Sequence, residues 1–198
     1  LCAVASLALG TAAAVAHLIA VAGGWVYNAW AKTTPASIVP YVLSFGLLPV
    51  VVAAVAGQPP PEGSAVTADV SAGLLGAPWW AVVTAACFGA GVHLANALPD
   101  LEVDARTGVR GLPQRLGARG SAVGTVLLLG LGAATVLFGP SGALLDVVTL
   151  GGAAVVTLLL AAIAWLGLRR HPEAAFKVAM LTGLVVVGLL VARGDALA

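Results

Sequence analysis

Uncharged, mostly apolar stretches recur along the chain, and each is about as long as one crossing of a membrane. They cover residues 12–30, 37–57, 77–98, 120–139, 147–168 and 175–192. A helix needs about 20 such residues to span a bilayer, because the hydrocarbon is about 30 Å thick and each residue rises about 1.5 Å. The pattern therefore predicts six transmembrane helices.

A shorter apolar segment, residues 1–9, precedes the first of these spans. It is too short to cross alone, and Gly10 and Thr11 are expected to form a turn after it. The chain begins at Leu1 inside this apolar run without a preceding cationic segment, which is not typical of a signal peptide. We expect a helix stub, and we interpret residues 1–198 as a single transmembrane domain that is incomplete at its amino end.

Composition supports the same class of protein. The chain of 198 residues is 61% hydrophobic and 9% charged, with a mean hydropathy of +1.07, whereas a soluble domain carries roughly 25% charged residues. A net charge of +1 excludes a nucleic-acid partner bound through a basic surface. Cys2 and Cys87 lie in apolar runs and indicate neither a disulfide framework nor a zinc site. The expected fold class is all-α, a polytopic transmembrane helix bundle in a lipid bilayer.

Positive charges gather on alternate loops. The opposite loops carry Glu62, Asp69 and Asp146, and Arg193 follows the last span. Because cytoplasmic loops carry an excess of Lys and Arg, we expect a multi-pass protein of the inner or plasma membrane with the basic face in the cytoplasm. If every stretch crosses, that face receives Lys32, Arg106, Arg110, Arg115, Arg119, Arg169, Arg170 and Lys177.

A polar cluster lies where the third span reaches this basic face. Asn96, Asp100 and Asp104 are spaced four residues apart, so on one continuous helix they fall within about 80° of one another. His93 lies in the same sector, one turn deeper. Two carboxylates and a carboxamide so placed suit Mg²⁺, which prefers oxygen ligands and commonly bridges carboxylates to substrate phosphates.

The following stretch, A-R-T-G-V-R-G-L-P-Q-R-L-G-A-R-G at 105–120, alternates arginines with glycines. It is interpreted as a mobile cationic flap that covers a diphosphate, since guanidinium groups pair with phosphate oxygens. Positive-inside anchoring and attraction to anionic lipid remain an alternative for each single arginine. For the aspartates, an alternative without function also remains open, in which they are solvated or paired with Arg106 and Arg110.

The acidic cluster resembles the second aspartate-rich motif of the UbiA-type membrane-embedded prenyltransferases. The motif is N-A-L-P-D-L-E-V-D at 96–104, and Arg106, Gly108 and G-L-P-Q-R-L-G at 111–117 follow it. The resemblance implies that Asn96, Asp100 and Asp104 bind Mg²⁺.

The resemblance extends over essentially the whole chain, from the end of the family's third helix through its ninth. Trp25-Val26-Tyr27-Asn28 leading to Lys32 is similar to the end of the fourth helix, where a Tyr and a Lys face the diphosphate pocket. Ala175-Phe176-Lys177 near the start of the last span is similar as well. Tyr27 is also explained as an interfacial anchor.

The resemblance implies nine spans in the family, around a cavity where two aspartate-rich motifs hold Mg²⁺ on the diphosphate of a polyisoprenyl donor. Departure of the diphosphate leaves an allylic cation, which a hydrophobic or aromatic acceptor attacks; an aromatic or quinone precursor is expected. The implied catalytic residues are Asp100, Asp104 and Tyr27. The implied substrate-binding residues are Asn96, Lys32, Arg106 and Arg110.

Two features depart from the family's pattern. No acidic residue precedes residue 58, so the first aspartate-rich motif has no counterpart, and this chain alone is expected to form half a metal site without turnover. Gly111 stands where the family usually has Thr, and Lys32 is five residues from Tyr27.

Two other classes of function remain open from the residues. A cation-coupled transporter would use Asp100 and Asp104 as its ion site, although such sites usually lie near the midplane at broken helices. In a membrane scaffold without enzymatic activity, the aligned carboxylates would be accidental.

Overall fold

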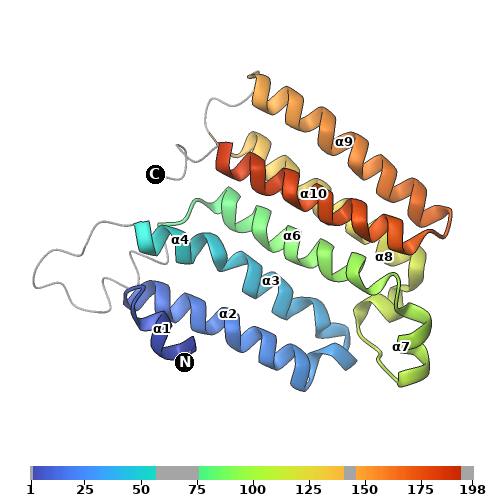
Figure 1. The fold of residues 1–198 in the computed structure, drawn as a ribbon, viewed down its shortest axis with the longest axis horizontal. Coiled ribbons are helices and arrows are strands. Elements are labelled where there is room, and N and C mark those ends of the chain that lie inside the picture. Colours follow the sequence, from blue (N-terminus) through green and yellow to red (C-terminus); the bar gives the residue numbers. More distant parts are fainter. Residues whose placement is uncertain (1, 57–75, 141–145, 193–198) are drawn as a thin grey trace, which may run out of the picture.

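The computed structural model describes residues 2–56, 76–140 and 146–192 (Figure 1). These residues form helices and their connections, without a strand in any of the three ranges. Glu62, Asp69 and Arg193 lie outside them. The helices are α1 Cys2–Leu7, α2 Thr11–Ala29, α3 Val39–Gly46, α4 Leu48–Ala56, α6 Trp79–Ala97, α7 Leu101–Thr107, α8 Leu112–Phe138, α9 Val147–Leu168 and α10 Pro172–Ala192, with short 3₁₀ helices η1 Ala31–Thr33 and η2 Pro35–Ile38.

Six helical segments are long and apolar enough to cross a membrane, as predicted. The predicted stub is the short helix α1, and five of the six predicted spans end within three residues of the observed bounds. The six segments are Thr11–Ala29, Pro35–Ala56, Trp79–Ala97, Leu112–Phe138, Val147–Leu168 and Pro172–Ala192.

Two of the spans are interrupted in ways that the apolar pattern did not predict. The second is assembled from η2, α3 and α4, with a break at Leu47 ahead of Pro49, where the ring removes a backbone donor and disfavours a continuous helix. The fourth begins at Leu112 rather than at residue 120, and Gly117 breaks it with φ 68° and ψ −179°. That positive φ favours glycine, which has no Cβ.

Helix α6 lies at the centre of the bundle. It packs against α8 and α3, while α9 and α10 cover α8 and α2 lies against α3 and α4 (Figure 1). The largest core cluster joins four of these helices through Trp80, Val136, Val156 and Val186, which are at most 4% exposed.

Small and hydroxylated residues bring α6 and α8 together. A Cβ on Gly132 would lie 3.1 Å from the backbone oxygen of Thr84, so a larger residue there would have to displace the α6 backbone. The Thr84 hydroxyl lies 2.8 Å from the Thr135 hydroxyl, which donates to the Gly132 carbonyl at 2.9 Å. Small residues and hydroxyl hydrogen bonds are the usual means of association between membrane helices.

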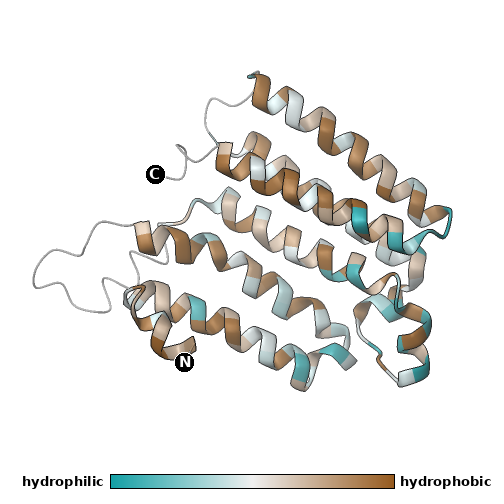
Figure 2. Ribbon diagram, viewed as in Figure 1, coloured by the Kyte–Doolittle hydropathy of each residue, from teal (hydrophilic) through white to brown (hydrophobic). Residues whose placement is uncertain are grey.

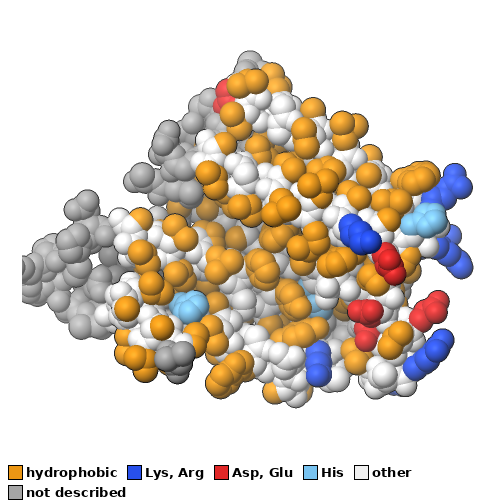
Figure 3. Space-filling view, in the orientation of Figure 1, with side chains coloured by type: hydrophobic (Ala, Val, Ile, Leu, Met, Phe, Trp, Pro, Cys, Tyr) orange, Lys and Arg blue, Asp and Glu red, His pale blue; other side chains and the backbone are white. Residues whose placement is uncertain are grey.

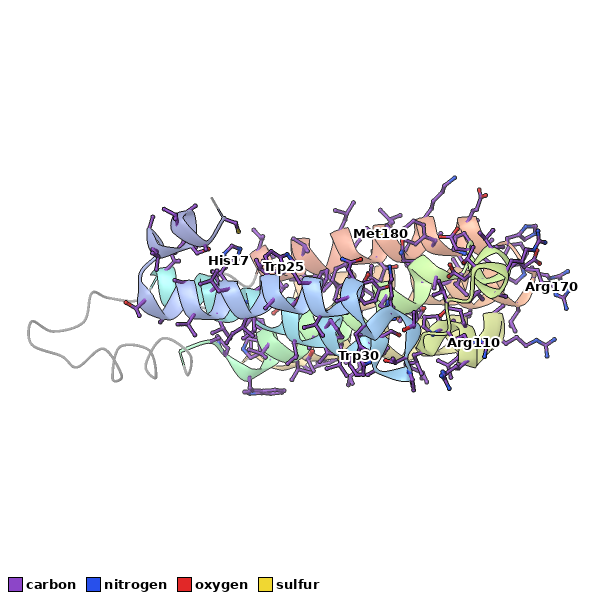
Figure 4. The ribbon with its side chains drawn as sticks, turned by 90° about the horizontal axis from the view of Figure 1, so that it is seen from below. His17, Trp25, Trp30, Arg110, Arg170 and Met180 are labelled. Atoms are coloured by element: carbon purple, nitrogen blue, oxygen red, sulfur yellow. The ribbon has the colours of Figure 1, made fainter. Side chains whose placement is uncertain are left out.

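The outer surfaces of the bundle are apolar along most of their length (Figure 2). Leu127, Leu158 and Leu184 are about two-thirds exposed, which fits a surface that faces lipid rather than water. On the face seen in Figure 3, the Lys and Arg side chains gather at the end that carries α7, and Figure 4 places Arg110 and Arg170 there, away from His17. We call this part of the molecule the charged end. The chain is an integral membrane protein.

Candidate active site at the charged end

A pocket of about 200 Å³ opens at the charged end, between α2, η1, α6, α7 and the start of α8. We call it the acid pocket. Its walls combine carboxylate, amide, amine, imidazole and phenol groups. The lining residues are Tyr27, Lys32, Ser37, His93, Asn96, Ala97, Asp100, Asp104, Val109 and Gln114.

The acidic cluster lies at a junction between helices. We expected one continuous helix through Asn96, Asp100 and Asp104, but α6 ends at Ala97 and α7 begins after Asp100. Pro99 lies between them, and a helix rarely continues through the residue before a proline. The Asp100 amide bonds the Ala97 carbonyl at 3.1 Å, and the Asp104 amide bonds the Asp100 carbonyl at 2.8 Å. The backbone stays coiled through the turn, and all three side chains line the acid pocket.

Asp104 is held by a partner that the sequence did not indicate. Gln114, in the first turn of α8, donates from Nε2 to Asp104 Oδ2 at 2.6 Å. The other amide atom, Oε1, is buried and has no partner in the described ranges. In those ranges neither Asp100 nor Asp104 forms an ion pair, so the expected alternative of pairing with Arg106 or Arg110 is wrong.

The arginine-rich stretch is not an extended loop in this structure. It forms the end of α7, a connection at residues 108–111 and the start of α8. Arg106 is exposed and lines neither cavity at this end. Arg110 lines a neighbouring cavity of about 390 Å³, and its carbonyl accepts from Arg115 Nε at 3.0 Å. The two cavities share Val109 and Gln114 as walls.

The rings of Tyr27 and His93 line the acid pocket, and both contact Tyr41, which is outside its lining. The ring centroids of Tyr27 and His93 are 5.8 Å apart, edge to face, and His93 stacks on Tyr41 at 4.4 Å. Tyr41 also meets the edge of Tyr27 at 5.2 Å, and ring contacts continue from Tyr41 through Phe45 to Phe88. Sequence reasoning missed Tyr41, although its spacing of four from Phe45 placed both on one helix face.

Hydrogen bonds of Ser37 tie His93 to the helix junction. Ser37, 1% exposed, lies with Oγ 3.0 Å from His93 Nε2, and it accepts from the Leu112 amide at 2.9 Å. Ser37 and Gln114 were not predicted as site residues. Ser37 is 56 residues from His93 in sequence, and no local spacing indicates that pairing.

Lys32 and Gly111 meet at the pocket's rim. Lys32, in η1, is exposed and lines the pocket. A Cβ on Gly111 would lie 2.9 Å from the Lys32 carbonyl oxygen and 3.0 Å from Ser37 Oγ. Glycine in place of the threonine noted at this position therefore has a physical reason, because a threonine side chain would displace η1 or the start of α8.

The donor set of the acid pocket fits a hard cation in part. Asn96, Asp100 and Asp104 offer amide and carboxylate oxygens, which are the ligands that Mg²⁺ prefers. Within 2–56, 76–140 and 146–192, however, no group of three or more His, Cys, Asp or Glu side chains could hold a metal ion by itself. A cation here would need further oxygens from water or from a phosphate ligand.

These features define a class of protein, a helical membrane protein with an acid-lined pocket at one end of its bundle. Comparisons with known proteins identify the family. The sequence model of the UbiA prenyltransferase family matches residues 1–185, and this chain therefore belongs to that family. The comparison with curated proteins gave no match.

A solved structure has the same fold. The apo structure of a UbiA homolog from Aeropyrum pernix K1 is similar with a TM-score of 0.67 and 16% sequence identity. The likeness covers 96% of this chain and 67% of that chain. The expected membership in the UbiA family and the all-helical membrane fold are both confirmed.

Proposed function

We propose that this protein transfers a polyisoprenyl group from an isoprenyl diphosphate to a hydrophobic acceptor, an aromatic or quinone precursor, and that the reaction takes place at the acid pocket. Membership in a family of membrane prenyltransferases supports the general activity. The observation that carries the choice of site is the gathering of Asn96, Asp100, Asp104, Lys32 and Tyr27 around one pocket.

Asn96, Asp100 and Asp104 would hold Mg²⁺, which when bound neutralises a diphosphate and favours its departure as an anion. The chain's own residues prepare this site. The bond from Gln114 fixes one oxygen of Asp104 and leaves the other for a ligand. Lys32 adds a positive charge at the rim, which stabilises the leaving anion electrostatically.

Arg106 and Arg110 would contribute from outside the acid pocket. Arg110 borders the adjoining cavity, which shares a wall with the acid pocket. Arg106 lies on α7, which also carries Asp104, and Arg110 lies in the connection from α7 to α8. We propose that they attract the anionic donor, with a smaller effect than that of the aspartates.

Tyr27 would face the allylic cation that remains when the diphosphate leaves. The face of an aromatic ring attracts a cation, and Tyr27 contacts the rings of Tyr41 and His93. Ring contacts continue from Tyr41 through Phe45 to Phe88, so apolar side chains lie behind Tyr27 on the side away from the carboxylates.

We propose that the charged end faces the cytoplasm at the inner or plasma membrane. Eight of the nine Lys and Arg residues belong to loops or helix ends predicted on that face, and positive residues are retained on the cytoplasmic side. The same position separates this proposal from a transporter, whose ion site is expected near the midplane.

The test is diphosphate release by the full-length protein in membranes, with a labelled isoprenyl diphosphate and an aromatic acceptor. We expect release to require Mg²⁺ and to fall by orders of magnitude in Asp100→Asn. Glu173→Gln is the matched control, since Glu173 is an exposed carboxylate at the start of α10. Undiminished release in Asp100→Asn would refute the site, and Asp100-dependent solute uptake into sealed vesicles would favour a transporter.

A further inference from the structure

His93 lines the acid pocket, and the function proposed above uses its ring as a neighbour of Tyr27 but gives its two nitrogens no role. It lies on α6 about one helical turn inward from Asn96, and only 4% of its surface is exposed. Its ring is fixed between Tyr27 and Tyr41. Its two nitrogens have different surroundings, and this difference decides which of them carries the proton.

The bond to Ser37 determines the tautomer of His93. A serine hydroxyl has one proton to donate. Ser37 Oγ already accepts from the Leu112 amide at 2.9 Å, and its one other partner in the described ranges is His93 Nε2 at 3.0 Å. Because a buried hydroxyl proton needs an acceptor, Ser37 donates to Nε2. The ring nitrogen that carries a proton is therefore Nδ1.

His93 lines the acid pocket, and Nδ1 is the ring nitrogen that Ser37 does not bond. It has no hydrogen-bond partner in residues 2–56, 76–140 or 146–192. Across those residues, Gln114 Oε1 is the one buried side-chain polar atom without a partner. A nearly buried side chain with an unused donor thus lines the same pocket as Asp100 and Asp104.

We propose that His93 binds the ligand of the acid pocket by donating a hydrogen bond from Nδ1 to an anionic phosphate oxygen. This inference rests on the proposed function, which supplies the diphosphate. Lys32 and Asn96 approach that ligand from exposed positions, whereas His93 approaches it from the interior. A neutral donor there stabilises the anion without placing a second charge among the aromatic rings.

Two variants separate this role from a structural one. The amide nitrogen of asparagine takes the place of Nδ1, so His93→Asn retains the donor and loses the contact with Ser37. The amide of glutamine reaches the place of Nε2, so His93→Gln retains the contact with Ser37 and loses the donor. Both remove the ring that stacks on Tyr41, and each is therefore the other's control.

The measurement is calorimetric binding of inorganic pyrophosphate with Mg²⁺ to the purified full-length protein, which requires no turnover. We expect His93→Asn to bind within about threefold of the wild type, and His93→Gln to bind at least tenfold more weakly, as for a lost hydrogen bond to a charged group. Equal binding by the two variants, or weaker binding by His93→Asn, overturns the proposal.

Nitrogen NMR of the ¹⁵N-histidine-labelled wild type tests the proposal without changing His93. His17→Gln and His171→Gln assign the signals of the other two histidines. We expect His93 to be protonated at Nδ1, with a signal that shifts when magnesium pyrophosphate is added. A proton at Nε2, or a shift caused by an aromatic acid but not by pyrophosphate, overturns the proposal.

Asp104→Asn separates a failure of the inference about His93 from a failure of the proposed function. If pyrophosphate binding depends on Asp104 but not on His93, the inference about His93 fails and the proposed function stands. If binding depends on neither residue, the proposed function fails as well.

Discussion

The crossing of α6 with α8 and the acid pocket are both rich in polar groups, but they use them differently. At the crossing, the hydroxyls of Thr84, Thr125 and Thr135 all have partners within the bundle. In the acid pocket, Gln114 Oε1 has none in the described ranges, and Asp100 forms no ion pair there. Polar groups at the crossing complete the packing, whereas those in the pocket remain without partners in the described ranges, as the proposed ligand site requires.

The difference extends along a single helix. The amino-terminal half of α6 contacts α8 through Thr84, and its carboxy-terminal half carries His93 and Asn96, which line the pocket. Unsatisfied polar groups reduce stability, and they are retained here where the family's chemistry is expected. Mutations at the crossing should therefore change stability, and mutations in the pocket should change activity and ligand binding.

The largest expected effect is that of Asp104→Asn. The substitution keeps the size of the side chain but removes the charge at the acid pocket, so we expect the rate of diphosphate release to fall by about 10²–10³-fold. The melting temperature of the apo protein should remain near that of the wild type, because Asp104 forms no ion pair in the described ranges. A large fall in melting temperature with little loss of rate would show that Asp104 supports packing, as the polar groups of the α6–α8 crossing do, and would contradict its role in the reaction.

A smaller effect is expected for Gln114→Ala. This residue holds Asp104 through a 2.6 Å hydrogen bond, and loss of a group that orients a metal ligand typically costs about 10–100-fold in metal affinity or activity. We expect the Mg²⁺ concentration for half-maximal release to rise within that range. Glu102→Gln, an exposed change on α7 outside the pocket lining, is the control, and an equal shift there would contradict the role of Gln114.

The crossing is tested by Gly132→Ala. The new Cβ would lie 3.1 Å from the Thr84 carbonyl oxygen and 3.3 Å from Cys87 Cβ, and overpacking of this kind costs about 1–3 kcal/mol. We expect a lower melting temperature with unchanged pyrophosphate affinity in the folded fraction. Gly151→Ala on α9 is the matched control, since nothing lies within 4 Å of its added Cβ. Equal loss of stability in both variants would remove the evidence for close packing.

Much of the fold could be predicted because each span is a run of apolar residues, and such a run needs no information from distant parts of the chain. The interruptions could not be predicted in the same way. Gly117 lies inside α8 with a positive φ, and one glycine in a helical stretch does not by itself predict a break. The break at Leu47 between α3 and α4 has a local cause in Pro49, but the apolar run continues through it, so hydropathy alone did not indicate it.

The residues of the candidate site also fall into two groups, those predictable from local spacing and those brought together by tertiary packing. Asn96, Asp100 and Asp104 lie within nine residues, so their common orientation followed from helical spacing even though Pro99 splits the helix. The partners of this cluster come from elsewhere in the chain. Ser37 reaches its position through tertiary packing, which a period of 3.6 residues does not encode.

The central claim is that the acid pocket binds a divalent cation together with a diphosphate. The most direct measurement is anomalous diffraction from crystals of the full-length protein soaked with Mn²⁺ and inorganic pyrophosphate. The account predicts a manganese peak within coordination distance of Asp100 and Asp104, with pyrophosphate density beside it, and loss of both in Asp104→Asn. Manganese and pyrophosphate bound elsewhere, with the two carboxylates uncoordinated, would contradict it.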